Sequence, residues 1–278
     1  MDIHNEALLI FQNIWVHSKR STVISTGDEK DATVNDPAIP NKWLARIKSK
    51  LDGEVDNSLA TDKRELLTGV SGTLVDGQVT VLTGQSGSGK SVLLRVLAGL
   101  APLSTGDVWL RKEDSRQNSN DYHSIHDALP IEWRAQVALL AQHPQLLEGS
   151  VLENLQLPYR LQAHQHNQFD IGWHIEQLAH LERTTDFLQQ KASHLSGGER
   201  QLVNTLRLLQ LNPRVLLLDE PTAALDAGTS ANLVQLLISW LHSKPKRALL
   251  WITHDTKDIM PLADKHWDMQ AGVLTKIV

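Results

Sequence analysis

The sequence has no cysteine, no long apolar run and no strong excess of charge of one sign. Without cysteine, the chain can form no disulfide bond, no thiolate metal site and no cysteine nucleophile. No segment approaches the roughly 18 consecutive apolar residues that span a membrane. The apolar stretch 7–11 follows a start with two acidic residues and is too short for a signal peptide. We therefore expect a soluble cytoplasmic chain that reaches a membrane only through a partner.

The charge balance is mildly acidic. Lysine and arginine number 27 against 32 aspartate and glutamate residues, which gives a net charge of −5. This balance argues against a broad nucleic-acid-binding face, and we expect no nucleic-acid partner. Hydrophobic residues make up 41% and charged residues 21%, which is typical of a globular chain and excludes a disordered or collagen-like one. The 278 residues suit one large domain or two small ones.

Five apolar stretches are predicted to form strands: 7–16, 79–83, 137–141, 215–218 and 248–252. The first is expected at the edge of a sheet. The later ones are continuous apolar runs, which are typical of parallel strands covered on both faces. A helix is predicted over 91–100, and helical patterns run from about 144 to about 211 with an interruption at 195–198. Strands that alternate with helices predict a three-layer α/β fold.

Two polar segments are predicted to lie at the surface. Residues 19–63 are rich in Ser, Thr, Asp, Asn and Pro, and we interpret them as an insertion made mostly of loop. One short helix is predicted inside it, beginning at Asn41 and ending near Gly53, because the apolar residues of 43–51 have helical spacing. Residues 111–128 are also polar and are predicted to form a surface loop.

A glycine-rich turn follows the strand predicted at 79–83. It fits the pattern G-x-x-x-x-G-K-[ST] at every position, with the residues Gly84, Gln85, Ser86, Gly87, Ser88, Gly89, Lys90 and Ser91. Glycines let the backbone N–H groups wrap closely around phosphates, and the next helix adds its positive dipole end. The lysine supplies a positive charge near the β- and γ-phosphates, and the Ser91 hydroxyl can ligate Mg²⁺. The turn therefore predicts a nucleotide phosphate site.

Polar residues follow three more of the predicted strands. Asp219 and Glu220 end the strand at 215–218, Gln142 follows the strand at 137–141, and His254 follows the strand at 248–252. The carboxyl ends of parallel strands lie at one edge of a sheet, where such folds bind their ligands. An Asp there can hold Mg²⁺, and an adjacent Glu can act as a general base toward water. We expect these side chains to converge on the phosphate site.

A second anion-binding loop is predicted in the middle of the helical region. Ser196, Gly197 and Gly198 come directly before an apolar helical stretch, so their N–H groups can bind an anion at a helix start. One nucleotide does not need two such loops from one chain. A head-to-tail pair of chains, in which each loop completes the partner's site, accounts for both.

These motifs together resemble the ATP-binding domain of ABC transporters. The resemblance covers about 64–278 and the first strand, within a single ATP-binding domain over 1–278. It implies a P-loop NTPase three-layer core with a mainly parallel sheet, an antiparallel β subdomain at the N-terminal side, and a helical subdomain over about 144–212 that carries the signature loop. In family terms the motifs are Walker A at 84–91, a Q-loop at Gln142, the signature at 195–199, Walker B at 215–220, a D-loop at 224–226 and a switch histidine at His254.

The resemblance also implies an activity, that of an ATP-binding and ATP-hydrolysing subunit that energises a membrane transporter. Its implied ligands are ATP and Mg²⁺, with the metal on Ser91, Gln142 and Asp219. The implied catalytic residues are Glu220, His254, Gln142 and Lys90. The signature residues Ser196, Gly197 and Gly198 would contact the γ-phosphate held by the opposite subunit, and Asp226 would join the nucleotide-binding set.

The implied partners are a polytopic membrane permease and a second copy of the chain in a head-to-tail ATP-sandwich dimer. The permease would dock on the stretch from Gln142 to about Tyr159, which places the chain on the cytoplasmic face of the inner membrane. Residues 151–158, 216–226 and 249–255 resemble small bacterial ATPases of the iron-export type. Where the family usually has an aromatic residue that stacks on adenine, this sequence has His17 and Ser18, and either His17 or Trp43 is a substitute.

Two other classes of function stay open from the residues. A soluble ATPase of the same family could act on ribosomes or DNA, although translation factors of that kind usually carry two ATPase domains and repair proteins carry long coiled coils. A P-loop kinase or GTPase would leave the loop at 195–199 unexplained. The cargo and the direction of transport do not follow from this sequence, because the membrane subunit selects the cargo.

Overall fold

A computed structural model describes residues 7–18, 64–113, 121–164 and 166–277. The chain divides into two units, one made of 1–16 with 65–278 and the other of 17–64. Only the first unit is described below, apart from the residues at 17, 18 and 64 that extend two of its strands. The short helix predicted between Asn41 and Gly53 lies outside the described residues.

The phosphate loop belongs to a six-stranded sheet with the strand order β10-β9-β3-β8-β7-β6. Four of these strands, β3, β6, β7 and β8, match the predicted parallel strands, and β9 and β10 were not predicted. The five strands β9, β3, β8, β7 and β6, in that spatial order, run parallel to one another. Strand β10 pairs antiparallel with β9. The strands are β3 (Val79–Thr83), β6 (Val137–Leu140), β7 (Val215–Asp219), β8 (Ala248–Ile252), β9 (Lys265–Gln270) and β10 (Val273–Lys276).

A second sheet has four strands in the order β2-β1-β4-β5. They are β1 (Ala7–Ser18), β2 (Arg64–Val75), β4 (Thr105–Arg111) and β5 (Tyr122–Ser124). Two predictions were wrong here. The first strand is not at an edge, because it lies between β2 and β4. The polar stretch 111–128 is not entirely loop, because β5 pairs antiparallel with β4 inside it.

Six α-helices and four 3₁₀-helices are described. Helix α2 confirms the helix predicted after the glycine-rich turn, while α3 and α7 were not predicted. The α-helices are α2 (Lys90–Leu97), α3 (Pro130–Gln136), α4 (Val151–Gln156), α5 (Ile171–His180), α6 (Gly197–Leu209) and α7 (Ala227–Ser243). The 3₁₀-helices are η2 (Leu157–Arg160), η3 (Thr185–Gln189), η4 (Ala192–His194) and η5 (Met260–Leu262).

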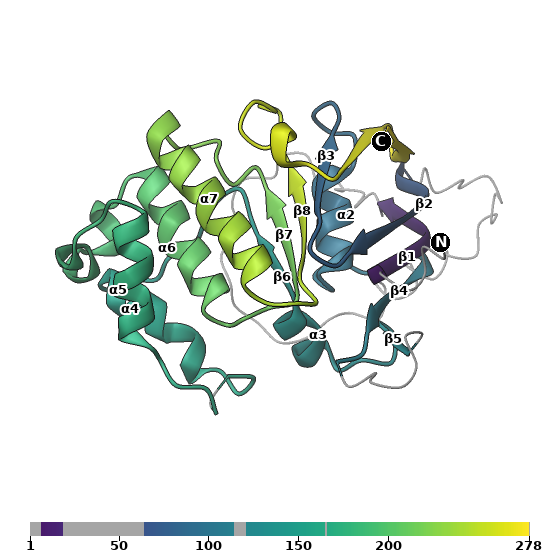
Figure 1. Ribbon diagram of the computed structural model, residues 1–278. Coiled ribbons are helices and arrows are strands. Elements are labelled where there is room, and N and C mark those ends of the chain that lie inside the picture. The colour runs from purple at the N-terminus through teal and green to yellow at the C-terminus, as the bar shows by residue number, and fades with distance from the viewer. Residues whose placement is uncertain (1–6, 19–63, 114–120, 165, 278) are drawn as a thin grey trace, which may run out of the picture. The chain divides into compact units, whose positions relative to one another are not determined.

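The six-stranded sheet is covered on both faces, as its continuous apolar strands predicted. Leu216, Leu218 and Trp251 pack into one buried cluster with residues of α4, α5, α6 and α7. Leu217 and Leu250 point the other way and pack into a second cluster with α2 and the four-stranded sheet. The three-layer α/β fold is therefore confirmed, and one outer layer contains the second sheet. Figure 1 shows this sheet flanked by α4, α5 and α6 on one side and by β1 and β4 on the other.

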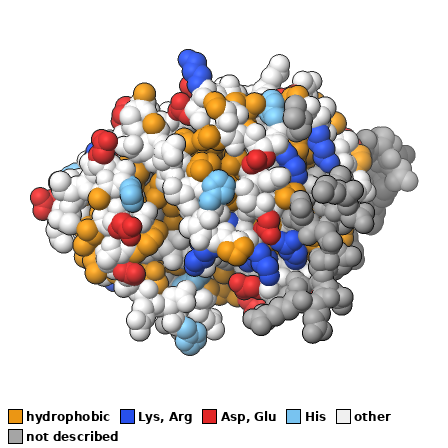
Figure 2. Space-filling view, viewed as in Figure 1, with side chains coloured by type: hydrophobic (Ala, Val, Ile, Leu, Met, Phe, Trp, Pro, Cys, Tyr) orange, Lys and Arg blue, Asp and Glu red, His pale blue; other side chains and the backbone are white. Residues whose placement is uncertain are grey.

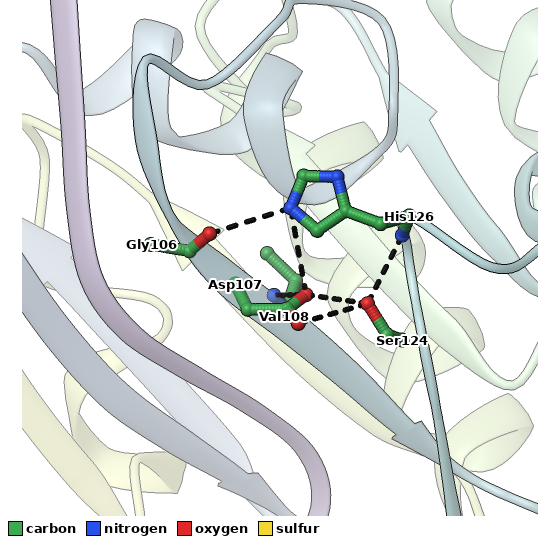
Figure 3. Close-up of polar contacts among 5 residues, drawn as sticks. All are labelled: Gly106, Asp107, Val108, Ser124 and His126. Carbon is green, nitrogen blue, oxygen red and sulfur yellow. Dashed lines mark hydrogen bonds and ion pairs between the residues drawn. The ribbon is translucent and has the colours of Figure 1, made fainter.

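A polar side-chain cluster joins the end of strand β5 to β4 (Figure 3). Ser124 donates its hydroxyl to the Asp107 carboxylate at 2.7 Å and accepts the His126 N–H at 3.1 Å. The His126 Nε2 atom lies 3.8 Å from Asp107 and 3.3 Å from the Gly106 carbonyl oxygen. Because the serine proton points to the carboxylate and not to the imidazole, this Ser, His and Asp set is a structural anchor and not a nucleophilic triad.

Candidate functional site

The phosphate loop connects β3 to α2 at the carboxyl edge of the parallel strands. Its lysine is buried and bends back onto the loop, where Lys90 Nζ donates to the Gly84 carbonyl at 2.6 Å and to the Gln85 carbonyl at 2.9 Å. Burial lowers the pKa of the Lys90 ammonium below its usual value, and the nearby carboxylates of Glu220, Asp219 and Asp268 oppose the shift. The ammonium is therefore partly desolvated and lies near acidic groups. When a phosphate binds, such a cation can leave the carbonyl oxygens of its own loop and contact the phosphate oxygens instead.

Two glycines of the loop are required by close backbone contacts. A Cβ on Gly84, whose φ is +136°, would lie 2.2 Å from the carbonyl oxygen of Met269 in β9. A Cβ on Gly89, at φ +107°, would lie 2.8 Å from the Leu66 carbonyl oxygen in β2. At both positions a side chain would clash with backbone that cannot rotate away. The loop therefore takes its shape from strands far away in the sequence.

The base of the loop is held by residues that the sequence interpretation missed. Thr83, the last residue of β3, donates its hydroxyl to Asp268 at 3.0 Å and has a second hydrogen bond of 2.8 Å to His266 Nε2. Both partners belong to β9, and Asp268 is one of the carboxylates near Lys90. The alternation of buried Trp267 and Met269 with polar residues in 265–270 is the signal that could have predicted this strand.

Gln142 and His254, which follow β6 and β8, both contact the carboxylate of Glu220, which follows β7. Gln142 Nε2 donates to Glu220 Oε2 at 2.8 Å, and His254 Nε2 lies 3.2 Å from Glu220 Oε1. The convergence of Gln142, Glu220 and His254, expected because the carboxyl ends of parallel strands lie at one edge, is therefore present. Glu220 keeps 21% of its side-chain surface exposed and His254 keeps 48%. The carboxylate is thus oriented from both sides and remains accessible to solvent.

The backbone of Glu220 is itself unusual. Its φ is +50°, in the left-handed region that costs a non-glycine residue about 1–2 kcal/mol. The Glu220 N–H donates to the Ile252 carbonyl of β8 at 3.1 Å, which holds this conformation. In this conformation the carboxylate contacts Gln142 and His254.

Residues with oxygen ligands lie around the same edge. Asp219 is buried at the end of β7, Ser91 is exposed in the first turn of α2, and Gln142 uses its nitrogen toward Glu220, which leaves its amide oxygen as a ligand. Among the described residues, no three His, Cys, Asp or Glu side chains gather as a metal site. One carboxylate with a hydroxyl and an amide oxygen fits Mg²⁺, which keeps water and phosphate among its ligands.

The second predicted anion loop forms the start of α6. Ser196 is its N-cap and accepts the Glu199 N–H at 3.2 Å, while Glu199 Oε2 accepts the Ser196 N–H at 2.9 Å. This capping box fixes the loop without using the N–H groups of Gly197 and Gly198. In the part of the chain that the structure describes, no hydrogen bond or ion pair joins Ser196, Gly197 or Gly198 to Lys90 or Ser91. No polar contact therefore links the two anion loops within the described part of one chain.

The loop 224–226 contacts the start of α6. A Cβ on Gly198 would lie 2.9 Å from a side-chain carbon of Leu225 and 3.1 Å from the Ala224 carbonyl oxygen. Asp226, expected among nucleotide-binding residues, caps α7 and accepts the Thr229 N–H at 3.0 Å. This hydrogen bond lowers the pKa of the Asp226 carboxyl. Asp226 therefore has a structural partner within its own chain.

A family model described as ABC transporter matches residues 67–223. The chain belongs to the ABC transporter family. It is 33% identical over 207 residues to the probable iron export ATP-binding protein FetA of Escherichia coli K12, covering 74% of this chain and 85% of the relative. It is 33% identical over 202 residues to the maltose/maltodextrin import ATP-binding protein MalK of Salmonella paratyphi A, covering 73% of this chain and 51% of the relative. The chain thus spans about half the length of the MalK relatives that it matches.

Solved structures of ABC transporter cassettes share the fold. A dimeric post-hydrolysis state of the ATP-binding cassette MJ0796 bound to ADP and Pi has a TM-score of 0.67 at 22% identity, covering 97% of this chain and 99% of that chain. A bacterial Atm1-family ABC exporter with ATP bound has a TM-score of 0.67 at 19% identity, covering 98% of this chain and 38% of that chain.

His17 and Trp43 are the two residues predicted to stack on adenine. His17 is described as the penultimate residue of β1, whereas Trp43 lies outside the described residues.

Among the described residues, no helix is long and apolar enough to cross a membrane.

Proposed function

We propose that this chain is the ATP-binding and ATP-hydrolysing subunit of a membrane transporter, and that ATP drives closure of a dimer of such chains. The observation that carries the proposal is the contact of both Gln142 and His254 with Glu220 at the sheet edge that holds Lys90. A general base must be oriented and reachable by water, and Glu220 meets both conditions.

The remaining roles follow from position. The N–H groups of residues 84–91 and the ammonium of Lys90 bind the phosphates of ATP, and the hydroxyl of the exposed Ser91 would ligate the metal. Ser88 supports the fit, because its Oγ is buried in the loop and has no hydrogen-bond partner among the residues that the structure describes. Ser91, Asp219 and Gln142 would hold Mg²⁺, which would neutralise phosphate charge when bound. Glu220 accepts a proton from the attacking water, and His254 contacts the γ-phosphate.

The second copy of the chain supplies the signature loop. Among the described residues, no hydrogen bond or ion pair joins Ser196, Gly197 or Gly198 to the phosphate loop of their own chain, and the N–H groups of the two glycines at the start of α6 suit an anion. A head-to-tail pair would place them on the γ-phosphate held by the partner. ATP then lies between two chains, and its hydrolysis removes the contact that holds them together.

The permease is proposed to dock on the stretch from Gln142 to about Tyr159. Leu147 is 58% exposed there, and a capping box between Ser150 and Glu153 fixes the start of α4 next to it. The exposed Leu147 beside this helix start would supply one apolar contact to the permease. Docking there would place the chain on the cytoplasmic face of the membrane that contains the permease.

The test of this function is nucleotide binding and phosphate release by the purified chain. The wild type is expected to bind a fluorescent ATP analogue and to release phosphate from Mg-ATP, while Lys90→Ala loses binding. Lys191→Ala, which changes an exposed lysine, is the matched control and should behave as the wild type. Equal ATP binding by Lys90→Ala and the wild type would contradict the proposed site.

A narrower proposal concerns the cargo, and it is iron export. It rests on the resemblance of segments 151–158, 216–226 and 249–255 to the iron-export type and on the identity to FetA. Cells that lack this chain are expected to accumulate more iron than wild-type cells, and Glu220→Gln should fail to restore the lower level. If cells that lack this chain have the same iron content as wild-type cells when both grow in excess iron, iron is not the cargo.

Action on ribosomes or DNA is not favoured. The relatives named above are import and export ATP-binding proteins. On the face drawn in Figure 2, Lys and Arg side chains lie among Asp and Glu side chains, which does not favour a nucleic-acid surface.

A further inference from the structure

The segment that follows β8 carries His254 and is folded into a turn by its own hydrogen bonds. Thr253 is buried and donates its hydroxyl to the Asp255 carbonyl at 2.5 Å, and the Asp255 carboxylate accepts the Lys257 N–H at 3.2 Å. Such side-chain bonds to nearby backbone are typical of turns. His254 keeps 48% of its side-chain surface exposed, so packing alone does not set the direction of its imidazole. That direction therefore depends on where the turn 253–258 is held.

One side-chain hydrogen bond ties this turn to helix α7. The Ser230 hydroxyl donates to Asp258 Oδ2 at 2.8 Å. Ser230 is only 4% exposed and lies near the start of α7, where its N–H donates to the Asp226 carbonyl at 2.8 Å. Ile259, which follows Asp258, is fully buried in the same apolar cluster as Leu233 of α7. A polar contact and a shared apolar cluster thus connect the turn to this helix.

A short stretch of turns connects the start of α7 to Glu220. The Ala223 N–H donates to the Glu220 carbonyl at 3.2 Å, and Asp226 caps the helix a few residues later. Turns and a capped helix start leave the backbone little freedom. Ser230 is therefore held at a nearly fixed place relative to Glu220.

Two side-chain contacts join the turn after β8 to the segment 220–230. His254 lies 3.2 Å from Glu220, and Asp258 accepts the hydrogen bond of Ser230 at 2.8 Å. The first contact belongs to the proposed active site. Among the described residues, no hydrogen bond or ion pair joins Ser230 or Asp258 to the phosphate loop. Loss of the second contact should therefore leave ATP binding intact.

The bond between Ser230 and Asp258 is not a helix cap. The capping position is filled by Asp226, whose two carboxylate oxygens accept the N–H and the hydroxyl of Thr229 at 3.0 and 2.8 Å. Serine hydroxyls inside helices commonly bond the carbonyl one turn earlier. The Ser230 hydroxyl instead reaches a carboxylate on a different segment of the chain. Its bond therefore connects two segments and does not complete the helix.

We propose that Asp258 is a positioning residue for His254 and acts through its hydrogen bond with Ser230. The inference rests on the proposed function, in which His254 contacts the γ-phosphate beside the general base Glu220. A hydrogen bond to a carboxylate is short and directional, so it limits how far the turn can move from α7. Without this bond the turn keeps its local hydrogen bonds, but its imidazole is no longer held at contact distance from Glu220.

The first test is phosphate release by the purified full chain, with binding of a fluorescent ATP analogue measured separately. Ser230→Ala and Asp258→Ala are each expected to lower kcat by about 5- to 20-fold and to leave the Kd for ATP unchanged. The double variant should lose no more than either single variant, because both remove the same bond. Asp258→Asn keeps an acceptor oxygen and should retain more turnover than Asp258→Ala. Asp258 is exposed, so its variants give the answer if Ser230→Ala does not fold.

The matched control is Ser124→Ala. Ser124 is also a buried serine that donates to an aspartate, that of Asp107 at 2.7 Å, but it lies in the four-stranded sheet. Its variant loses the same kind of hydrogen bond and should keep the kcat of the wild type. A fall in kcat in both serine variants would show a general loss of stability and would contradict a specific role for Ser230.

The second test observes His254 directly and needs no ATP hydrolysis. The imidazole C–H resonance of His254, identified by His254→Gln, is expected to shift in Ser230→Ala and in Asp258→Ala but not in Ser124→Ala. An unchanged resonance in the folded variants would overturn the proposal, as would a wild-type kcat or a Kd for ATP that rises as much as kcat falls. A wild type that hydrolyses no ATP would instead contradict the proposed function, and the resonance alone would then decide whether Asp258 positions His254.

Discussion

The side-chain amide of Gln142 donates a hydrogen bond of 2.8 Å to the carboxylate of Glu220, although the two residues are 78 positions apart in the sequence. With His254 at 3.2 Å on the other oxygen, both carboxylate oxygens have a polar neighbour. In the proposed function, this arrangement orients the general base before water attacks. The amide of Gln142 can hold the base through its nitrogen and the metal through its oxygen.

Removing the amide should therefore slow hydrolysis while the fold remains intact. We expect Gln142→Ala to lower kcat by about 10- to 100-fold, which is the effect of losing one hydrogen bond to a charged group. Because Gln142 is exposed, the melting temperature should change little. Phosphate release at saturating Mg-ATP measures kcat, and His143→Ala at the neighbouring exposed position is the control. A kcat equal to that of the wild type would show that Gln142 does not orient Glu220.

The signature loop should act on the nucleotide of the partner chain. Lys90→Ala and Ser196→Arg are each expected to be inactive, and mixing the two should restore one working site per heterodimer. The Lys90 variant still offers its signature, and the Ser196 variant still offers its phosphate loop. Phosphate release at high protein concentration measures the recovery. Lys90→Ala mixed with the double variant Lys90→Ala, Ser196→Arg is the control, since it contains no intact pair of loops. A mixture as inactive as its parents would count against the trans arrangement.

The insertion over 19–63 should be dispensable for the ABC fold. β1 ends at Ser18 and β2 begins at Arg64, and these strands are neighbours in their sheet, so a short Gly/Ser bridge should connect them. Each doubling of loop length changes the closure free energy by only about 0.6 kcal/mol. Thermal melting of the deletion variant is expected to remain cooperative, with ATP binding retained. Loss of the cooperative transition would show that the segment belongs to the core.

His174 should make stability depend on pH in the weakly acidic range. Burial lowers its pKa, against the opposing hydrogen bonds to Asp170 and Gln210, so the folded state keeps it neutral below its usual value of about 6.5. The unfolded chain then binds more protons, and the free energy of unfolding falls as the pH drops from about 6.5 toward the folded pKa. His174→Phe should reduce the fall in melting temperature between about pH 7.5 and about pH 5.5. His180→Phe, at an exposed position of the same helix, is the control. An unchanged slope in His174→Phe would contradict the lowered pKa.

The parts of the site that could be predicted are those that depend on strand direction alone. Continuous apolar strands run parallel, so Gln142, Glu220 and His254 at their carboxyl ends had to meet at one edge. The glycine pattern at 84–91 likewise indicated the loop, since close backbone approach requires it.

The parts that could not be predicted depend on pairing between distant segments. The position of β1 between β2 and β4 follows from registers that no local pattern encodes. Strand β5 has three residues in a polar stretch, and its anchor is the contact of Ser124 with Asp107. The support of Thr83 by Asp268 was missed because β9 was not predicted.

The central claim is that Glu220 is the general base, and Glu220→Gln tests it most directly. The change is nearly isosteric, so the strand end should survive, but an amide cannot accept the proton of water. Turnover is expected to fall by about 10²–10⁴-fold. ATP affinity should hold or rise, because a negative charge near the γ-phosphate is removed. The variant should accumulate as an ATP-bound dimer in size-exclusion chromatography with Mg-ATP and remain monomeric with Mg-ADP. Hydrolysis at a near wild-type rate would falsify the general-base assignment, and loss of ATP binding would place Glu220 in a structural role instead.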